Sequence, residues 1–182
     1  REALIEALVA DLHTALAERL EAVCRNSQAD DPAAAIIALG HAYWDWAIAN
    51  PQHFRLTYGH PAGEQREVPE SAHRVPGMLA RLVADAARLN APGPPVPDSA
   101  YHTYDWADFA PDYLARIRAA HPDVSPAAIA LALRLWARMH GLVSLEVYGH
   151  LGSQTREPAK LFHAEIRHFV AAIGGRGNGR KP

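Results

Sequence analysis

Residues Ser125 to Leu151, SPAAIALALRLWARMHGLVSLEVYGHL, decide the fold of this chain. Ser125 can cap the free backbone N–H groups of a helix start, and Pro126 suits the first helical position because it has no N–H to leave unpaired. Apolar residues then recur every three or four positions on two sides of the expected helix. Since a helix that is apolar on more than one side is buried on more than one side, we expect it to pack against its own domain and a second copy.

The composition narrows the classes of protein that fit. A chain of 182 residues suits one domain with a core of its own. Cys24 is the only cysteine, so an internal disulfide is excluded and a cytoplasmic location is favoured. The net charge of −2 argues against a large nucleic-acid surface on these residues. No apolar run reaches the length of about 18 residues that a membrane span needs, so we expect no membrane association.

The remaining apolar patterns also have helical spacing, and none alternates with a period of two for long enough to indicate a strand. The predicted fold class is therefore all-α, with about six helices. Asn90 to Pro97 is rich in proline and predicts a stiff connector, and Pro111 predicts a kink or break near Ala110. Besides the segment quoted above, the expected helices cover Arg1–Arg25, Pro32–Asn50, Gln52–Gly59, Ala72–Leu89, Ser99–Ala120 and Pro158–Ile173.

One pair of residues raises the possibility of a metal site. Glu165 and His168 have the Glu-x-x-His spacing that di-iron helical bundles use. Such a site needs a second motif of this kind and two further glutamates, whereas Glu146 and His150 are one residue too far apart. The simpler interpretation is a polar pair on the last helix, and we predict no catalytic residue, metal or cofactor.

Aromatic residues from several expected helices form the other notable group. Each one could belong to the ordinary core, or together they could line a mostly apolar pocket for a small molecule. His140 lies one turn after Trp136 and has the same two interpretations. The group contains Tyr43, Trp44, Trp46, Phe54, Tyr58, Tyr104, Trp106 and Trp136.

Two segments carry a resemblance to a known family. Trp136 to Gly141, WARMHG, and the residues that follow to Leu151 resemble the WHG-type ligand-binding domain of TetR-like transcriptional regulators. Tyr43 to Gly59, with Asn-Pro before Phe-Arg-Leu, is similar to the aromatic helix of the same branch. Arg1 to Ile5 resembles the start of the helix that follows the DNA-reading helix-turn-helix in this family.

The resemblance implies that different parts of the chain have different roles. Residues 1–175 would form the ligand-binding and dimerisation domain, with 1–25 as the connecting helix and 176–182 as a flexible basic tail. Pro126–Leu151 and Pro158–Ile173 would form a four-helix bundle across a two-fold axis. The residues expected at the centre of that interface are Leu142, Leu145, Phe162 and Phe169. The residues expected to bind the effector are Tyr43, Trp46, Phe54, Tyr58, Tyr104, Trp106, Trp136, Met139 and His140.

The function implied is that of the sensing half of a bacterial, homodimeric regulator, typically a repressor released by a small apolar or aromatic effector. The helix-turn-helix itself is absent from these residues, so operator DNA would be contacted only through a module expected before Arg1. Two alternatives stay open: a small helical enzyme or metal-binding bundle that uses Glu165 and His168, and a helical interaction module without a ligand.

Overall fold

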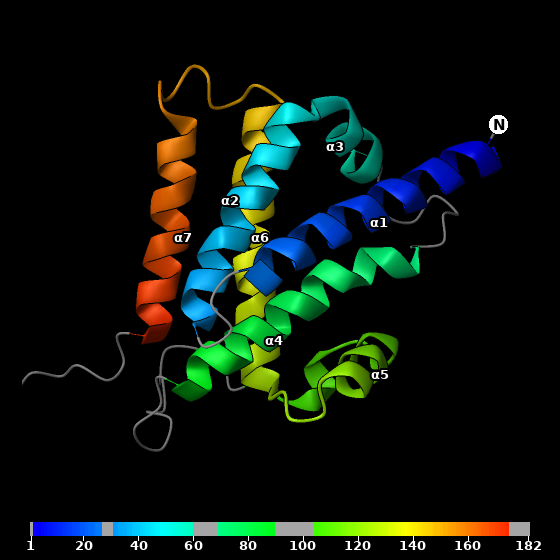
Figure 1. The fold of residues 1–182 in the computed structure, drawn as a ribbon, viewed down its shortest axis with the longest axis vertical. Helices are drawn as coiled ribbons and strands as arrows, with labels where there is room; N and C mark the ends of the chain where they lie inside the picture. The colour runs from blue at the N-terminus through cyan, green and yellow to red at the C-terminus, as the bar shows by residue number, and fades with distance from the viewer. Residues whose placement is uncertain (1, 27–30, 60–68, 90–103, 175–182) are drawn as a thin grey trace, which may run out of the picture.

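The computed structural model describes residues 2–26, 31–59, 69–89 and 104–174. These residues form helices and no strand, which confirms the all-α prediction (Figure 1). The expected connector Asn90–Pro97 and the tail 176–182 lie outside the described residues. The α-helices are α1 (Glu2–Asn26), α2 (Pro32–Ala49), α3 (Pro51–Tyr58), α4 (Arg74–Leu89), α5 (Pro111–Ala120), α6 (Pro126–Val147) and α7 (Pro158–Gly174), and two 3-10 helices, η1 (Glu70–His73) and η2 (Trp106–Asp108), precede α4 and α5.

The helix starts follow from local chemistry. The Ser125 hydroxyl accepts a hydrogen bond from the backbone N–H of Ala128 at 3.2 Å, so the cap expected for α6 is present. At the start of α2, the Asp31 carboxylate accepts from Ala34 N–H at 2.9 Å in the same way. Proline occupies the first helical position after both caps, where its missing N–H costs nothing.

One expected helix boundary is confirmed and another needs correction. The break predicted near Ala110 is present: the described part of Ser99–Ala120 is a short 3-10 helix followed by α5, because Pro111 holds Ala110 in an extended conformation with ψ at 133° and starts a new helix. The α6 helix ends at Val147 rather than Leu151, because Gly149 adopts a φ of 80°. The N–H groups of Gly149 and of the next residue then bond back into the last turn, as in a Schellman motif.

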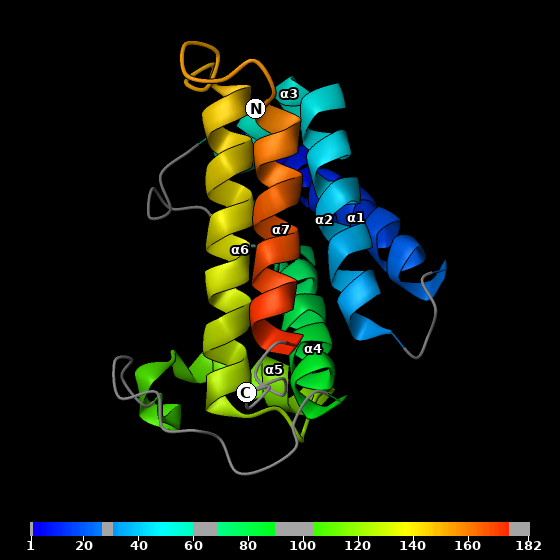
Figure 2. The same cartoon turned by 90° about the vertical axis from the view of Figure 1, so that its left-hand side faces the viewer.

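The α6 helix runs beside α7 along one side of the molecule and contacts α2, α4 and α7 (Figure 2). Its length and mean hydropathy of 1.2 would also suit a membrane span, and α6 is the one helix among the described residues that has both properties. In the structure 39% of that window is buried, so packing in the protein core accounts for part of the same composition. Close approach of α7 to α2 depends on Gly40, where an added Cβ would lie 3.3 Å from Ile166.

The α3 helix is attached to the end of α6 through Arg55. Its guanidinium donates a hydrogen bond of 2.6 Å to the carbonyl of Val147 and lies 5.8 Å from the centre of the Tyr148 ring. The carbonyl is one of the last in α6, which have no partner within the helix. This contact holds the aromatic residues of α3 next to those of α6.

Candidate functional site

Most of the aromatic residues proposed for the effector site converge where α2, α3 and α6 meet. The hydroxyl of Tyr43 lies 2.9 Å from Nδ1 of His140. The Phe54 ring stacks on the His140 ring with centroids 5.4 Å apart, and Tyr58 meets the same imidazole nearly at right angles at 4.7 Å. Trp136 closes the group, 5.2 Å from Tyr43. We call Tyr43, Phe54, Tyr58, Trp136 and His140 the aromatic cluster.

The aromatic cluster is packed as core rather than arranged around an open space. Tyr43 and Phe54 are fully buried, and Met139 and Trp46 are buried in the same core. Burial raises the pKa of Tyr43 well above its ordinary value and lowers the pKa of His140, so both side chains are held in their neutral forms.

Tyr104 and Trp106 do not join the cluster. Tyr104 is 42% exposed and stacks on Phe109 with ring centroids 6.0 Å apart. The Trp106 ring lies under the guanidinium of Arg118 at 4.9 Å. Trp106 belongs to η2, and Tyr104 lies two residues before it. The η2 and α5 helices lie near the start of α6, whereas α3 lies near its end (Figure 1). The prediction that Tyr104 and Trp106 share one site with Tyr43 and His140 is therefore corrected: the structure places them apart.

Buried histidines predict acid sensitivity of the fold. Burial lowers the folded-state pKa of His13, His41, His121 and His140 below 6.5, with smaller contributions from His73 to His13 and from His163 to His41. A lowered folded-state pKa means that the stabilisation is complete above the unfolded-state pKa and is lost as the pH falls through the folded-state value.

We therefore expect the Tm to fall when the pH is lowered from about 7.5 to about 5, a range in which unfolded histidine with a pKa near 6.5 takes up its proton. Replacing His140 by glutamine should reduce the slope of Tm against pH. Differential scanning calorimetry across this pH range measures the slope for the unchanged protein and for the variant. Equal slopes would contradict the contribution assigned to His140.

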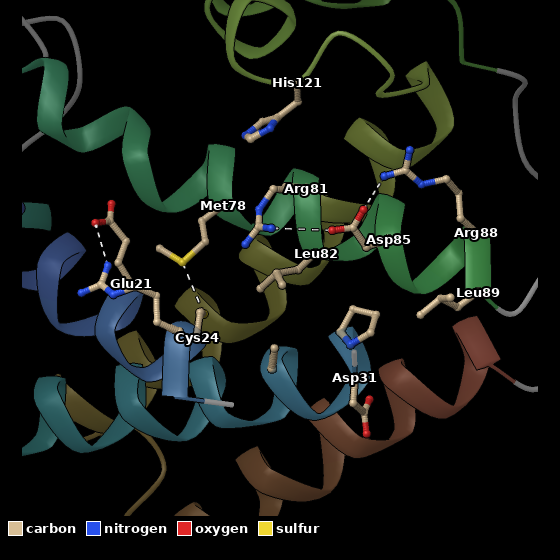
Figure 3. Close-up of a pocket in the computed structure, with 13 residues that line it drawn as sticks. Glu21, Cys24, Asp31, Met78, Arg81, Leu82, Asp85, Arg88, Leu89 and His121 are labelled. Atoms are coloured by element: carbon tan, nitrogen blue, oxygen red, sulfur yellow. Dashed lines mark hydrogen bonds and ion pairs between the residues drawn. The ribbon is translucent and has the colours of Figure 1, made fainter. Parts of the chain in front are cut away.

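A cavity of about 800 Å³ lies elsewhere, between α1, α2 and α4 (Figure 3). A volume of this size is within the range of small-molecule pockets. The last turns of α1 and the start of α2 form one side, and the second half of α4 faces them. Its lining residues are Glu21, Cys24, Arg25, Asp31, Pro32, Ala35, Met78, Arg81, Leu82, Asp85, Arg88, Leu89 and His121.

The inner part of the cavity is apolar. The Cys24 thiol lies 3.4 Å from the Met78 sulfur, which joins α1 to α4 directly, and Leu82 lies on the same side of α4 (Figure 3). Burial raises the pKa of Cys24, so the thiol stays protonated. Ala35 of α2 completes this part of the wall.

The rim of the cavity is charged. Arg88 donates a hydrogen bond to Asp85, while the guanidinium of Arg81 lies 3.8 Å from the same carboxylate. On the opposite side, the two oxygens of Glu21 accept hydrogen bonds of 3.0 and 2.7 Å from Arg74. The guanidinium of Arg25 lies further from Glu21, at 3.9 Å.

Sequence reasoning predicted an effector cavity among the helices at Arg1–Arg25, Pro32–Asn50, Ala72–Leu89 and Ser99–Ala120, but it did not identify the residues that line this one. Its rim residues on α4 have the spacing of ion pairs on a solvated helix face, which is the usual interpretation of such a pattern. The apolar residues below them have core spacing. The two sets of residues line one cavity because the last turns of α1 lie beside α4. That placement is a tertiary property, which residue spacing does not show.

The residues expected at the centre of the dimer interface have different environments. Phe162 is fully buried within the protomer, 4.8 Å from the Trp44 ring, and Phe169 is buried beneath the Arg138 guanidinium. Neither phenylalanine is exposed to a partner, so these two assignments need revision. Leu142 is half-buried, and Leu145 is 41% exposed.

The carboxylate proposed for a metal site already has a protein partner. Arg138 donates a hydrogen bond of 2.5 Å to Oε1 of Glu165, and His168 is exposed on the next turn of α7. Within the described ranges, no three side chains of histidine, cysteine, aspartate or glutamate come together as metal ligands. This arrangement favours the interpretation of Glu165 as an ion-pairing residue.

Comparisons with known proteins agree with this helical architecture. The family described as "Tetracyclin repressor-like, C-terminal domain" matches residues 36–169. The HTH-type transcriptional regulators Rv1816 of Mycobacterium tuberculosis (strain H37Rv) and Mb1846 of Mycobacterium bovis are each 27% identical over 180 residues, which cover 95% of this chain and 74% of each relative.

A solved structure of a protein with unknown function from Rhodococcus sp. RHA1 has the same fold. It superposes with a TM-score of 0.66 at 22% sequence identity, and the match covers 96% of this chain and 73% of that one. Because the family match extends over most of the helical domain, from α2 to α7, the chain belongs to the family of tetracycline repressor-like C-terminal domains.

Proposed function

We propose that the chain is the effector-binding and dimerisation part of a DNA-binding transcriptional regulator that acts as a homodimer in the cytoplasm. The family membership and the names of the mycobacterial relatives support this role. In this proposal the domain is not an enzyme, and it represses transcription until a small molecule binds.

The cavity between α1 and α4 is the observation on which the sensing role rests. Cys24 and Arg25 of α1 line it together with Met78 and Arg81 of α4. A molecule bound there contacts both helices, so it favours the arrangement in which their separation fits the ligand. A ligand shifts a protein between two arrangements only when it binds one of them more tightly, and a ligand that contacts both helices would bind one separation of them more tightly than another.

The α1 helix is the proposed connection to the DNA-reading module. A helix-turn-helix dimer needs its two recognition helices about 34–36 Å apart to enter successive major grooves. A ligand-dependent tilt of α1 would change that separation. The effector would therefore control DNA binding from a site that makes no contact with DNA.

The proposed dimer forms through outward faces of α6 and α7. Leu133 and Leu145 of α6 are 37% and 41% exposed, and Leu161 of α7 is 46% exposed. Between the two leucines of α6, Ala137 and Gly141 are also exposed and follow the same four-residue spacing. These residues form an apolar face with small side chains at its centre, which a two-fold axis can place against its own copy. We call Leu133, Ala137, Gly141 and Leu145 the outward face of α6.

DNA binding provides the test of the whole role. We expect the 182 residues alone to form dimers and to select no sequence from a random DNA library, because the proposed DNA-reading module lies outside them. The product of the complete reading frame should select a palindromic site. Sequencing of the bound DNA measures both results, and selection of a specific site by the 182 residues alone would contradict the assigned role.

A further inference from the structure

The cavity between α1 and α4 has two chemically different parts, and the difference indicates what it binds. Its inner wall consists of apolar or weakly polar side chains, including Cys24, Met78 and Leu82. Its rim carries arginine side chains from both helices. A molecule that satisfies both parts has an apolar body and a polar end.

The rim carries three arginines and three carboxylates, but they are paired unevenly. Asp85 is the shared partner of Arg81 and Arg88, and the hydrogen bond comes from Arg88. At 3.8 Å, the distance from Arg81 to the carboxylate is too long for a hydrogen bond. The guanidinium of Arg81 is half exposed and can turn toward a ligand.

The other carboxylates near the rim are also occupied. Glu21 is held by two hydrogen bonds from Arg74, which leaves Arg25 with a distant contact of 3.9 Å. Asp31 accepts a hydrogen bond from Ala34 as the cap of α2. Burial is the main cause of the lowered pKa of His121, the positive charge of Arg81 lowers it further, and Asp85 opposes both.

From this arrangement we infer that the cavity binds an organic carboxylate with an apolar body, whose carboxylate pairs with Arg81 and whose body lies against Cys24, Met78 and Leu82. The inference deepens the proposed function, because it assigns a chemical class to the proposed effector. Arginine suits this role because its planar guanidinium can donate two parallel hydrogen bonds to one carboxylate.

The single cysteine provides a direct test of the location. Alkylation of Cys24 by N-ethylmaleimide at alkaline pH reports whether the cavity is occupied, since no other thiol exists in the chain. Octanoate, 1-octanol and octylamine serve as probes with the same apolar body and different ends. Octanoate should slow alkylation at a concentration about tenfold lower than 1-octanol, the difference expected for hydrogen bonds to a charged group. Octylamine should protect least.

Arginine variants test the partner of the carboxylate. Arg81→Gln should remove the advantage of octanoate over 1-octanol and leave the protection by 1-octanol unchanged. Arg19→Gln, on the exposed face of α1, is the matched control and should leave the advantage intact. Circular dichroism verifies that each variant is folded. Equal protection by octanoate and 1-octanol in the unchanged protein, or an unchanged preference in Arg81→Gln, would overturn the inference.

Experiments on the complete regulator bound to its selected DNA test the sensing role separately from the chemical class of the ligand. Release of DNA by 1-octanol with protection of Cys24, but without an effect of octanoate, would overturn the carboxylate class and leave the sensing role standing. Protection of Cys24 by octanoate without release of DNA would support the carboxylate class and contradict the proposed sensing role. Octanoate that binds without protecting Cys24 would overturn the location.

Discussion

Arginine in place of Gly141 is expected to convert the proposed dimer into a folded monomer. Gly141 is exposed in the middle of the outward face of α6, and a Cβ added there would meet nothing within 4 Å in the protomer. In the proposed dimer the same position lies near the two-fold axis, so each subunit would bring a charge into an apolar contact. An unpaired buried charge costs about 3–5 kcal/mol, which corresponds to at least a hundredfold weaker dimer.

Sedimentation velocity measures this result, and circular dichroism shows whether the monomer keeps its helices. Ala15→Arg on the exposed side of α1 provides a matched control with the same new charge, and it should stay dimeric. A Gly141→Arg protein that remains a dimer would remove this face from the interface. A protein that is monomeric before any substitution would contradict the dimer itself.

Gly141→Ala gives a finer version of the same experiment. In the protomer the added methyl group has free space, and alanine is favoured over glycine in a helix interior by about 1 kcal/mol. Across the proposed axis, however, the methyl group separates two closely packed helices. We therefore expect the free energy of unfolding of the protomer to rise and the affinity of the dimer to fall. A simple folding defect would lower both.

The sequence predicted the helices better than the surfaces on which they meet. Caps, prolines and apolar spacing are local properties, so the start of α6 at Pro126 was predictable from Ser125 alone. The orientation of α7 is not local. Its apolar residues include Phe162 and Phe169, and the spacing does not show that both turn into the protomer. That orientation depends on contacts with α2, such as the close approach of Ile166 to Gly40.

The difference between local and tertiary properties also explains which parts of the candidate site could be predicted. Tyr43 and His140 are 97 positions apart, yet their helices were both recognisable and both residues were expected in one effector site; their direct contact was not predicted. Tyr104 looked equally suitable because it is an aromatic residue near an expected helix. The break before Pro111 places it outside the cluster, and the spacing of aromatic residues contains no information about that position.

Alanine in place of Phe54 should destabilise the domain by about 3–5 kcal/mol, the usual cost of removing a fully buried phenylalanine. Phe54 is fully buried, stacks on His140 and contacts Tyr58 at 5.1 Å, so its loss leaves a cavity at the junction of α2, α3 and α6. For a domain of this size the Tm should fall by about 10 °C. The reason is that the aromatic cluster is packed core, whose rings support one another.

The matched control is Tyr104→Ala, which removes another aromatic ring that the sequence placed in the same site. Because Tyr104 is 42% exposed and contacts Phe109 only at 6.0 Å, its loss should cost less than about 1 kcal/mol. Urea unfolding followed by tryptophan fluorescence measures both free energies. If Phe54→Ala lowered the free energy of unfolding no more than Tyr104→Ala, the aromatic cluster would be loosely packed. It would then again be a candidate effector site. We expect a difference of several kcal/mol, because truncating a fully buried ring also leaves a cavity behind.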